Sequence, residues 1–169
     1  DGDLDAYVGN IYGQGNIVWL NDGTGVLSDS GQSLGSSHTM AVVLGDLDND
    51  GDPDALVANY GQANVVWLNL SPAGTPTPTP TATLARGELF VDSAQSLGGS
   101  YSYRVALGDL DGDDDPDAYV ANGNDQADKV WLNGGTALFT DSGQNLGSAW
   151  SLDVAFGDTD GDGDLDALV

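Results

Sequence analysis

Aspartates recur at every second position in three short segments of the chain. The segment GDLDNDGDPD at 45–54 contains five of them, and similar segments occur at 108–117 and 157–166. Calcium takes about six to eight oxygen ligands from carboxylates, carbonyls and water, and a chain that wraps around the ion presents alternate residues to it. The spacing therefore predicts three calcium-binding loops.

The expected role of each aspartate follows from its position, counted from the first aspartate of its loop. Positions 1, 3 and 5 supply side-chain oxygens, glycine at position 6 allows a sharp turn, the carbonyl of position 7 faces the ion, and position 9 closes the cage. The expected metal sites comprise Asp46, Asp48, Asp50, Asp52 and Asp54; Asp109, Asp111, Asp113, Asp115 and Asp117; and Asp158, Asp160, Asp162, Asp164 and Asp166.

Two places depart from this pattern. Loop 109–117 has Asp114 at position 6, and aspartate adopts a left-handed conformation better than most residues but at some strain, so we expect a geometrically poorer site. The chain also starts with the second half of a loop, in which Asp1, Asp3 and Asp5 form a fourth, half-complete calcium site. We expect covalent continuation of the repeat array or a neighbouring chain to complete this half-site.

The loops hold most of the charge of the protein. They and the N-terminal half-loop contain 19 of the 26 aspartates, against three Lys and Arg residues and a net charge of -24. Such charge disfavours nucleic acid and anionic membranes as partners, and no apolar segment is long enough for membrane insertion. Solvated acidic turns without metal are the alternative, but spaced copies with position 9 intact are more specific than one motif. Magnesium fits less well because it keeps its waters.

One segment occurs four times along the chain. Its copies are DGDLDAYVGN at 1–10, DGDPDALVAN at 50–59, DDDPDAYVAN at 113–122 and DGDLDALV at 162–169. Such self-similarity predicts a tandem-repeat fold. The expected division is a partial repeat at 1–40, a second repeat at 41–104, a third at 105–153, and the start of another at 154–169.

Short β-rich runs within each repeat predict strands and almost no helix. Examples are 41–44, 55–58 and 65–68, with a fourth strand expected near 89–91 or 138–140. We therefore expect an all-β fold of tandem four-stranded antiparallel sheets, with about three blade-like repeats per chain. Closed propellers typically have about four to eight blades, so the chain is expected to belong to a larger propeller or an open, fibrous array.

A Thr/Pro-rich insert at about 70–86 interrupts the second repeat. Alternating Thr and Pro favour extended polyproline II structure, so we expect a surface excursion that adds nothing to the core. An unmodified linker and a glycosylated one both fit this composition. Its candidate glycan acceptors are Thr75, Thr77, Thr79, Thr81, Thr83 and, in a sequon weakened by the following proline, Asn69.

The order of these motifs resembles a known family. A strand ending in Phe-Gly or Leu-Gly, the loop D-x-D-x-D-G-x-x-D, a strand ending in Ala-Asn and a VWLN strand are similar to FG-GAP/VCBS-type repeats, which are related to the integrin α-subunit propeller blades. The resemblance covers nearly the whole chain except the insert. It implies calcium in a hairpin of each blade, an extracellular or cell-surface location, and roles in adhesion or scaffolding, with some sugar-binding members.

No catalytic arrangement is predicted. His38, the single histidine, lies in a Ser-rich turn without a second ligand, and no nucleophile or phosphate-loop motif occurs. Trp19, Trp67 and Trp131 recur at one phase of the repeat, which indicates core residues. Trp150 lies outside that phase, at the place in its repeat that Tyr101 and Tyr103 have in the preceding copy, and is the best single candidate for contact with a ligand or a neighbour.

The leading hypothesis is a non-catalytic extracellular calcium-binding β-repeat protein with a structural or adhesive role, which self-associates into a surface scaffold or fibre. The alternatives are a glycan-binding, lectin-like propeller and an accessory module of a secreted hydrolase.

Overall fold

The structure is a computed structural model that describes residues 3–70 and 89–169. Within these ranges the chain forms strands, turns and loops without a helix, so no helix there could cross a membrane. The predicted near-absence of helix is confirmed for this part of the chain. Asp1, most of the insert, and the acceptors Thr75, Thr77, Thr79, Thr81 and Thr83 lie outside the described residues.

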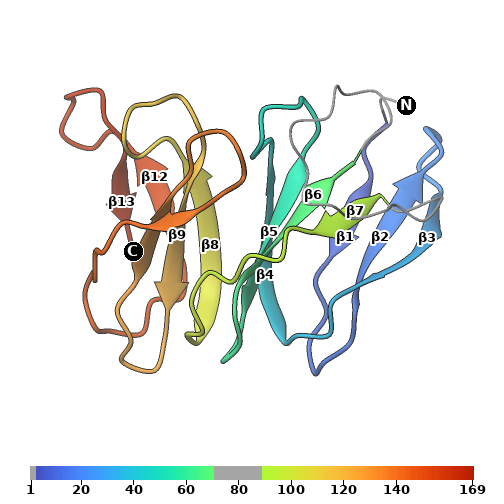
Figure 1. The fold of residues 1–169 in the computed structure, drawn as a ribbon, viewed down its shortest axis with the longest axis horizontal. Coiled ribbons are helices and arrows are strands. Elements are labelled where there is room, and N and C mark those ends of the chain that lie inside the picture. The colour runs from blue at the N-terminus through green and yellow to red at the C-terminus, as the bar shows by residue number, and fades with distance from the viewer. Residues whose placement is uncertain (1–2, 71–88) are drawn as a thin grey trace.

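The strands form four antiparallel sheets that stand side by side along the long axis (Figure 1). The first sheet contains β1 (Ala6–Val8), β2 (Asn16–Asn21) and β3 (Leu27–Leu34), and the second contains β4 (Thr39–Gly45), β5 (Asp54–Asn59), β6 (Val65–Asn69) and β7 (Phe90–Asp92). The third contains β8 (Ser102–Gly108), β9 (Asp117–Asn122), β10 (Lys129–Leu132) and β11 (Thr140–Asp141), and the last contains β12 (Ala155–Gly157) and β13 (Asp166–Leu168). The expectation of an all-β fold built from tandem antiparallel sheets is confirmed.

One strand register recurs through the molecule and places each aspartate loop. Gly45 pairs with Asp54, Gly108 with Asp117, and Gly157 with Asp166. Each loop is therefore the hairpin between the first two strands of its sheet. The sequence repeat thus places an aspartate hairpin at the same corner of successive sheets.

The core lies between neighbouring sheets. Residues of β5 alternate between two clusters, with Ala55 and Val57 packed toward the first sheet and Leu56 and Ala58 toward the third. A further cluster around Tyr119 joins the third sheet to the last. Because the middle sheets bury both faces, β5 and β9 consist entirely of buried residues.

The recurring tryptophans lie at these interfaces to different degrees. Trp67 is buried between the first and second sheets, and Trp131 packs against the cluster between the second and third. Trp19 and Trp131 are both half-buried, but Trp19 belongs to none of the core clusters among the described residues. The core role predicted from their common phase is confirmed for Trp67 and Trp131.

Candidate metal centres

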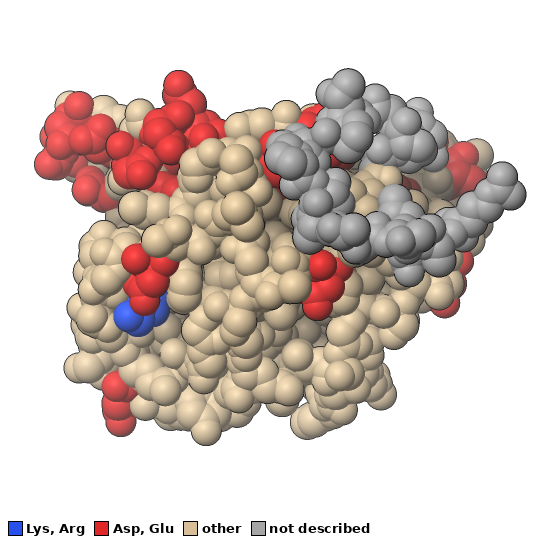
Figure 2. Space-filling model, in the orientation of Figure 1, with Lys and Arg blue, Asp and Glu red and all other residues tan. Residues whose placement is uncertain are grey.

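The three aspartate loops lie along one edge of the stacked sheets. Figure 1 shows the hairpins β4–β5, β8–β9 and β12–β13 turning at the same end of the strands. Carboxylates gather along that upper edge on the visible face of the molecule (Figure 2). The fold thus concentrates at one edge the negative charge that is spread along the sequence.

Position 1 of each loop organises the turn through backbone hydrogen bonds. The N–H groups of Asp50 and Gly51 donate to the two oxygens of Asp46 at 3.1 and 3.0 Å. Asp109 accepts from three successive N–H groups, those of residues 112, 113 and 114, at 2.8, 3.2 and 3.0 Å. Asp158 accepts in the same way from residues 161, 162 and 163. The loops are therefore already wrapped around their first carboxylate.

Two residues in each loop have left-handed backbone conformations. At position 6, Gly51 has φ 94°, Asp114 has φ 71° and Gly163 has φ 100°. The left-handed conformation expected of Asp114 is therefore present. Position 4 is also left-handed, with φ angles of 61° at Asn49, 82° at Gly112 and 84° at Gly161. The sequence interpretation missed position 4, although the Asn, Gly and Gly found there favour this conformation.

Position 9 ties each loop to the sheet. Asp54 is buried, and its two oxygens accept from the N–H of Leu47 at 3.0 Å and of Asn69 at 2.7 Å. In the next repeat, Asp117 accepts from Leu110 at 2.9 Å and Asn133 at 2.8 Å. The asparagine of the WLN sequence thus joins the third strand to the loop. Sequence reasoning missed this partner, for which its recurrence after each VWL was the available signal.

Carboxylate oxygens converge in all three loops. Oxygens from three aspartates lie within 4.8 Å of one another in each of the sets Asp46, Asp48, Asp50; Asp109, Asp111, Asp117; and Asp158, Asp160, Asp166. Positions 1 and 3 belong to every set, whereas the third member is position 5 in the first loop and position 9 in the others. The remaining predicted ligands within the described ranges, including the position 7 aspartates, lie outside these sets.

The N-terminal half-loop keeps part of the pattern. Asp5 accepts from the N–H of Asn21 at 2.8 Å, as position 9 does in the complete loops. Asp3 and Asp5 are both exposed. Asp1, the third carboxylate of the half-site, lies outside the described residues, so the half-site stays a prediction.

Burial without a nearby positive charge raises the pKa of several loop carboxyl groups. Burial, followed by the charge of Asp50, raises the pKa of Asp48, and burial raises the pKa of Asp54 to about 7 despite two backbone hydrogen bonds. Burial also raises the pKa of Asp117, and partial desolvation followed by the charges of Asp117, Asp113 and Asp109 raises the pKa of the exposed Asp111. Conversely, backbone hydrogen bonds, led by that from Gly112, hold the pKa of Asp109 below its usual range. A cation would offset the cost of keeping the raised groups ionised.

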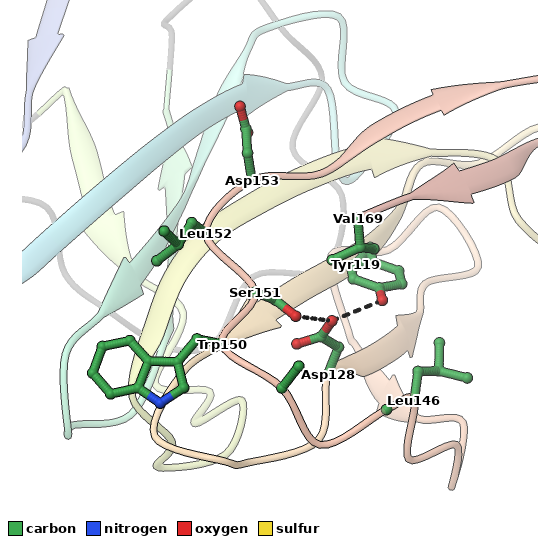
Figure 3. A pocket seen from close by; sticks show the side chains of 10 residues that line it. Tyr119, Asp128, Leu146, Trp150, Ser151, Leu152, Asp153 and Val169 are labelled. Atoms are coloured by element: carbon green, nitrogen blue, oxygen red, sulfur yellow. Dashed lines mark hydrogen bonds between the residues drawn. The ribbon is translucent and has the colours of Figure 1, made fainter.

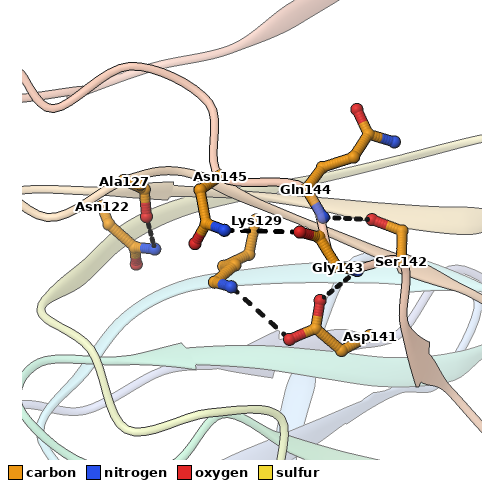
Figure 4. A network of polar contacts seen from close by, with 8 residues as sticks. All are labelled: Asn122, Ala127, Lys129, Asp141, Ser142, Gly143, Gln144 and Asn145. Carbon is orange, nitrogen blue, oxygen red and sulfur yellow. Dashed lines mark hydrogen bonds and ion pairs between the residues drawn. The ribbon is translucent and has the colours of Figure 1, made fainter.

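The two basic residues within the described ranges do not offset this charge. Lys129 pairs with Asp141 at 3.5 Å (Figure 4), and Arg104 pairs with Asp153 at 2.9 Å. Both aspartates lie outside the loops, and no salt bridge in residues 3–70 and 89–169 reaches a loop carboxylate.

One buried oxygen indicates where an ion fits. Oδ1 of Asp48 is buried and has no hydrogen-bond partner among the described residues. An unpartnered buried carboxylate oxygen is costly, and here it belongs to a side chain of the first carboxylate set. A donor set made only of hard oxygens suits calcium or magnesium rather than a soft metal.

The first loop is also held by the repeat that follows it. The N–H of Ala137 and the side-chain amide of Asn133 donate to the carbonyl of Leu47 at 2.7 and 3.0 Å. The amide of Asn49 donates to Asp115 of the next loop at 2.7 Å. Aspartate loops 46–54 and 109–117 are therefore in direct contact.

The predicted glycan acceptor Asn69 is half-buried next to this edge. Its Nδ2, the atom that a glycan would modify, donates to the carbonyl of Pro53 at 3.3 Å. A glycan on Asn69 would replace one of the two hydrogens of this nitrogen and leave the other to donate.

Comparison with known families gives one result. The model of the FG-GAP-like repeat matches residues 1–57, 46–120 and 109–169, so three overlapping matches span the whole chain. The second and third matches begin at position 1 of an aspartate loop, at Asp46 and Asp109. A search of curated proteins finds no match.

Proposed function

Because the chain belongs to the FG-GAP-like repeat family over its whole length, we propose that it is a non-catalytic extracellular calcium-binding β-repeat protein with a structural or adhesive role. The observation that carries the calcium proposal is the convergence of three carboxylates in every loop. The unpartnered oxygen of Asp48 and the absence of a salt bridge to any loop in the described parts of the chain support it.

The proposed ligands come from positions 1, 3, 5 and 9, with the carbonyl of position 7 added. In loop 46–54, Asp54 holds the hairpin to the third strand of its sheet, because the backbone N–H groups of Leu47 and Asn69 already engage both of its oxygens. Bound calcium would neutralise the repelling carboxylates and restrain the hairpin, so its binding energy would add to the free energy of unfolding.

The structural role rests on how the sheets stack. Leu168 of β13 is 72% exposed, whereas its counterpart in the second sheet, Leu56, is 0% exposed because the third sheet covers it. Val8 of β1 is likewise more exposed than its counterpart Val57. We propose that further repeats cover these outer faces, supplied by other copies of this chain or by covalent continuation of the repeat array.

Thermal unfolding in calcium and in chelator tests the calcium proposal. We expect the Tm to rise by at least about 10 °C between EDTA and excess calcium, since several filled sites each add binding energy. Isothermal titration should show binding of calcium in preference to magnesium. An unchanged Tm in the two buffers would refute the proposal.

A charge-matched pair of triple variants separates specific binding from general screening. Asp46→Asn, Asp109→Asn and Asp158→Asn together alter position 1 of every loop, whereas Asp29→Asn, Asp92→Asn and Asp125→Asn remove the same charge from exposed positions outside the loops. Only the first set should abolish the calcium-dependent rise in Tm. Equal responses of the two variants would indicate non-specific screening.

Light scattering and electron microscopy test the association. Particles larger than one chain are expected in calcium, and Leu168→Lys should reduce their number by placing a charge in the stacking face. Monomers at every concentration in calcium would overturn the self-association proposal and leave the calcium proposal standing.

A further inference from the structure

A row of aromatic rings crosses the sheet edge opposite the aspartate loops. Ring centroids are 5.3 Å apart between Tyr12 and His38, 5.4 Å between His38 and Tyr60, and 4.7 Å between Tyr60 and Tyr101. Tyr103 continues the row, 5.6 Å from Tyr60 and 6.1 Å from Trp150. The aromatic row, defined as these six residues, thus runs from the first sheet to the segment before the last.

Two positions of the repeat supply most of the row. The first position comes immediately before a Thr or Ser near the start of each repeat. It is occupied by His38 in SSHTM, Tyr101 in GSYSY and Trp150 in SAWSL. Tyr12 follows β1 and Tyr60 follows β5, and both stand in the sequence YGQ before the next strand. The row is therefore generated by the repeat and is not one isolated cluster.

A buried hydroxyl residue follows each of His38, Tyr101 and Trp150 and orients the aromatic side chain toward solvent. The hydroxyl of Thr39 donates to Asn59 at 3.1 Å, that of Ser102 donates to Asn122 at 2.8 Å, and that of Ser151 donates to Asp128 at 2.7 Å. All three hydroxyl residues are buried. Because successive residues of an extended chain point to opposite sides, the preceding aromatic side chain faces away from the core.

The result is clearest at Trp150. Figure 3 shows Ser151 directed at Asp128, which also accepts from the Tyr119 hydroxyl at 3.0 Å, while the Trp150 ring extends away from them. Trp150 is 56% exposed, and Tyr12 at the other end of the row is 81% exposed. Large aromatic side chains held at such exposure offer rigid apolar faces to a ligand at low entropic cost.

Amide groups lie beside the rings. Oε1 of Gln62 accepts from the N–H of His38 at 2.8 Å, and Oε1 of Gln126 accepts from the N–H of Tyr101 at 2.7 Å. Each glutamine is thus fixed next to a ring by its oxygen, while its NH₂ group has no partner among the described residues. An aromatic face next to a free amide donor matches a sugar ring, which presents flat C–H faces and hydroxyl rims.

The charge of this edge selects among glycans. The connecting segments at 9–15, 35–38, 60–63, 98–101, 123–127 and 147–150 contain one aspartate, Asp125, and no Lys or Arg. The edge is therefore close to neutral, while the rest of the molecule is strongly acidic and repels polyanions. An extended ligand without charge fits both facts.

We propose that the aromatic row binds an uncharged polysaccharide, whose chain lies across the sheets and stacks its sugar rings on Trp150, Tyr101 and the tyrosines between Trp150 and Tyr12. Gln62 and Gln126 donate to its hydroxyl groups. The row spans several repeats, so its ligand is a polymer and not a single sugar. This binding does not depend on the identity of the metal in the loops.

Affinity electrophoresis in calcium buffer tests the proposal. The probes are soluble hydroxyethyl cellulose and glucomannan as neutral polysaccharides, with hyaluronan as the acidic one. The wild-type chain should be retarded by at least one neutral polysaccharide and not by hyaluronan. Trp150→Ala and Tyr101→Ala should each weaken retardation about tenfold in polymer concentration, whereas Leu138→Ala, which removes an exposed side chain outside the row, should not.

Further variants exclude a merely structural effect. Gln126→Ala should weaken binding, Trp150→Tyr should largely restore it, and all variants should keep the wild-type Tm in calcium. Absence of retardation by every neutral polysaccharide, or equal retardation of the wild type and Trp150→Ala, would overturn the proposal. Capture of a protein partner by the row without any polysaccharide binding would overturn it as well.

Discussion

Loops 46–54 and 109–117 have the same aspartate spacing and occupy the same corner of successive sheets, yet they are buried to different degrees. Asp48 and Asp50 are half-buried, while their counterparts Asp111 and Asp113 are exposed. At position 2, Leu47 is 0% exposed and belongs to the core between two sheets, whereas Leu110 only packs against the edge of the next cluster.

The following repeat causes this difference. Ala137 and Asn133 donate to the carbonyl of Leu47, and no such contact reaches Leu110 within the described part of the chain. The comparison shows that the spacing of the aspartates sets which atoms can meet, while packing by the next repeat sets how deeply they are buried.

The largest expected effect comes from Leu47. Leu47→Ala removes a fully buried side chain and should lower the free energy of unfolding by about 2–5 kcal/mol in calcium. Leu110→Ala should cost about half as much because Leu110 is only partly buried. Denaturant unfolding of both variants measures the difference, and a larger loss at Leu110 would contradict the comparison.

Exchange of the position 6 residues tests the strain difference between the loops. Gly51→Asp forces a side chain into a backbone with φ 94° and should cost about 1–2 kcal/mol. Asp114→Gly should gain at most about 1 kcal/mol, because relief at φ 71° is offset by the greater entropy of glycine in the unfolded chain. Chemical denaturation in calcium gives both values. A lower free energy of unfolding for Asp114→Gly would show that Asp114 stabilises its loop relative to glycine.

Asp48 should respond oppositely with and without metal. Its raised pKa means that the folded state holds the proton more tightly than the unfolded state, so the ionised form at pH 7 lowers the stability of the metal-free protein. Asp48→Asn should raise the Tm in chelator by about 1–3 °C and lower it in calcium. Asp111→Asn should change the Tm in chelator less, because Asp111 is exposed. A fall in the Tm of Asp48→Asn in chelator would contradict this account.

The smallest effect concerns the contact between the two loops. Asn49→Gly removes the amide that donates to Asp115 but keeps a residue suited to φ 61°, so it should cost only about 0.5 kcal/mol. A double-mutant cycle with Asp115→Ala should give a coupling of similar size. Strict additivity of the two changes would mean that the contact adds nothing to stability.

Much of the fold could be predicted from the sequence because its signals are local. Short β-rich runs bounded by Gly, Asn and Asp specify the hairpins, and the repeated aspartates place each loop at the Gly45–Asp54 type of corner. Within a loop, the convergence of positions 1 and 3 follows from spacing alone.

Contacts between repeats could not be predicted in this way. The bond from Asn133 to Leu47 joins residues 86 positions apart, and it depends on how one sheet is placed against the next. The same is true of the aromatic row, because the local sequence indicates an exposed Trp150 but not its alignment with Tyr60 and Tyr12 from other sheets. Such alignments are set by the rotation between sheets, which residue spacing does not specify.

The contact from residues 133–137 to Leu47 runs in one direction along the chain, because within the described residues loop 46–54 is covered by the repeat that comes after it and not by the one before it. An array built by such contacts has a polarity. Under the proposed calcium binding, an ion would leave first from a loop that no following repeat covers, and its loss would loosen the contact with the preceding loop. Metal ions would then be lost from one loop after another in a fixed direction. The array would shorten while the remaining repeats keep their arrangement.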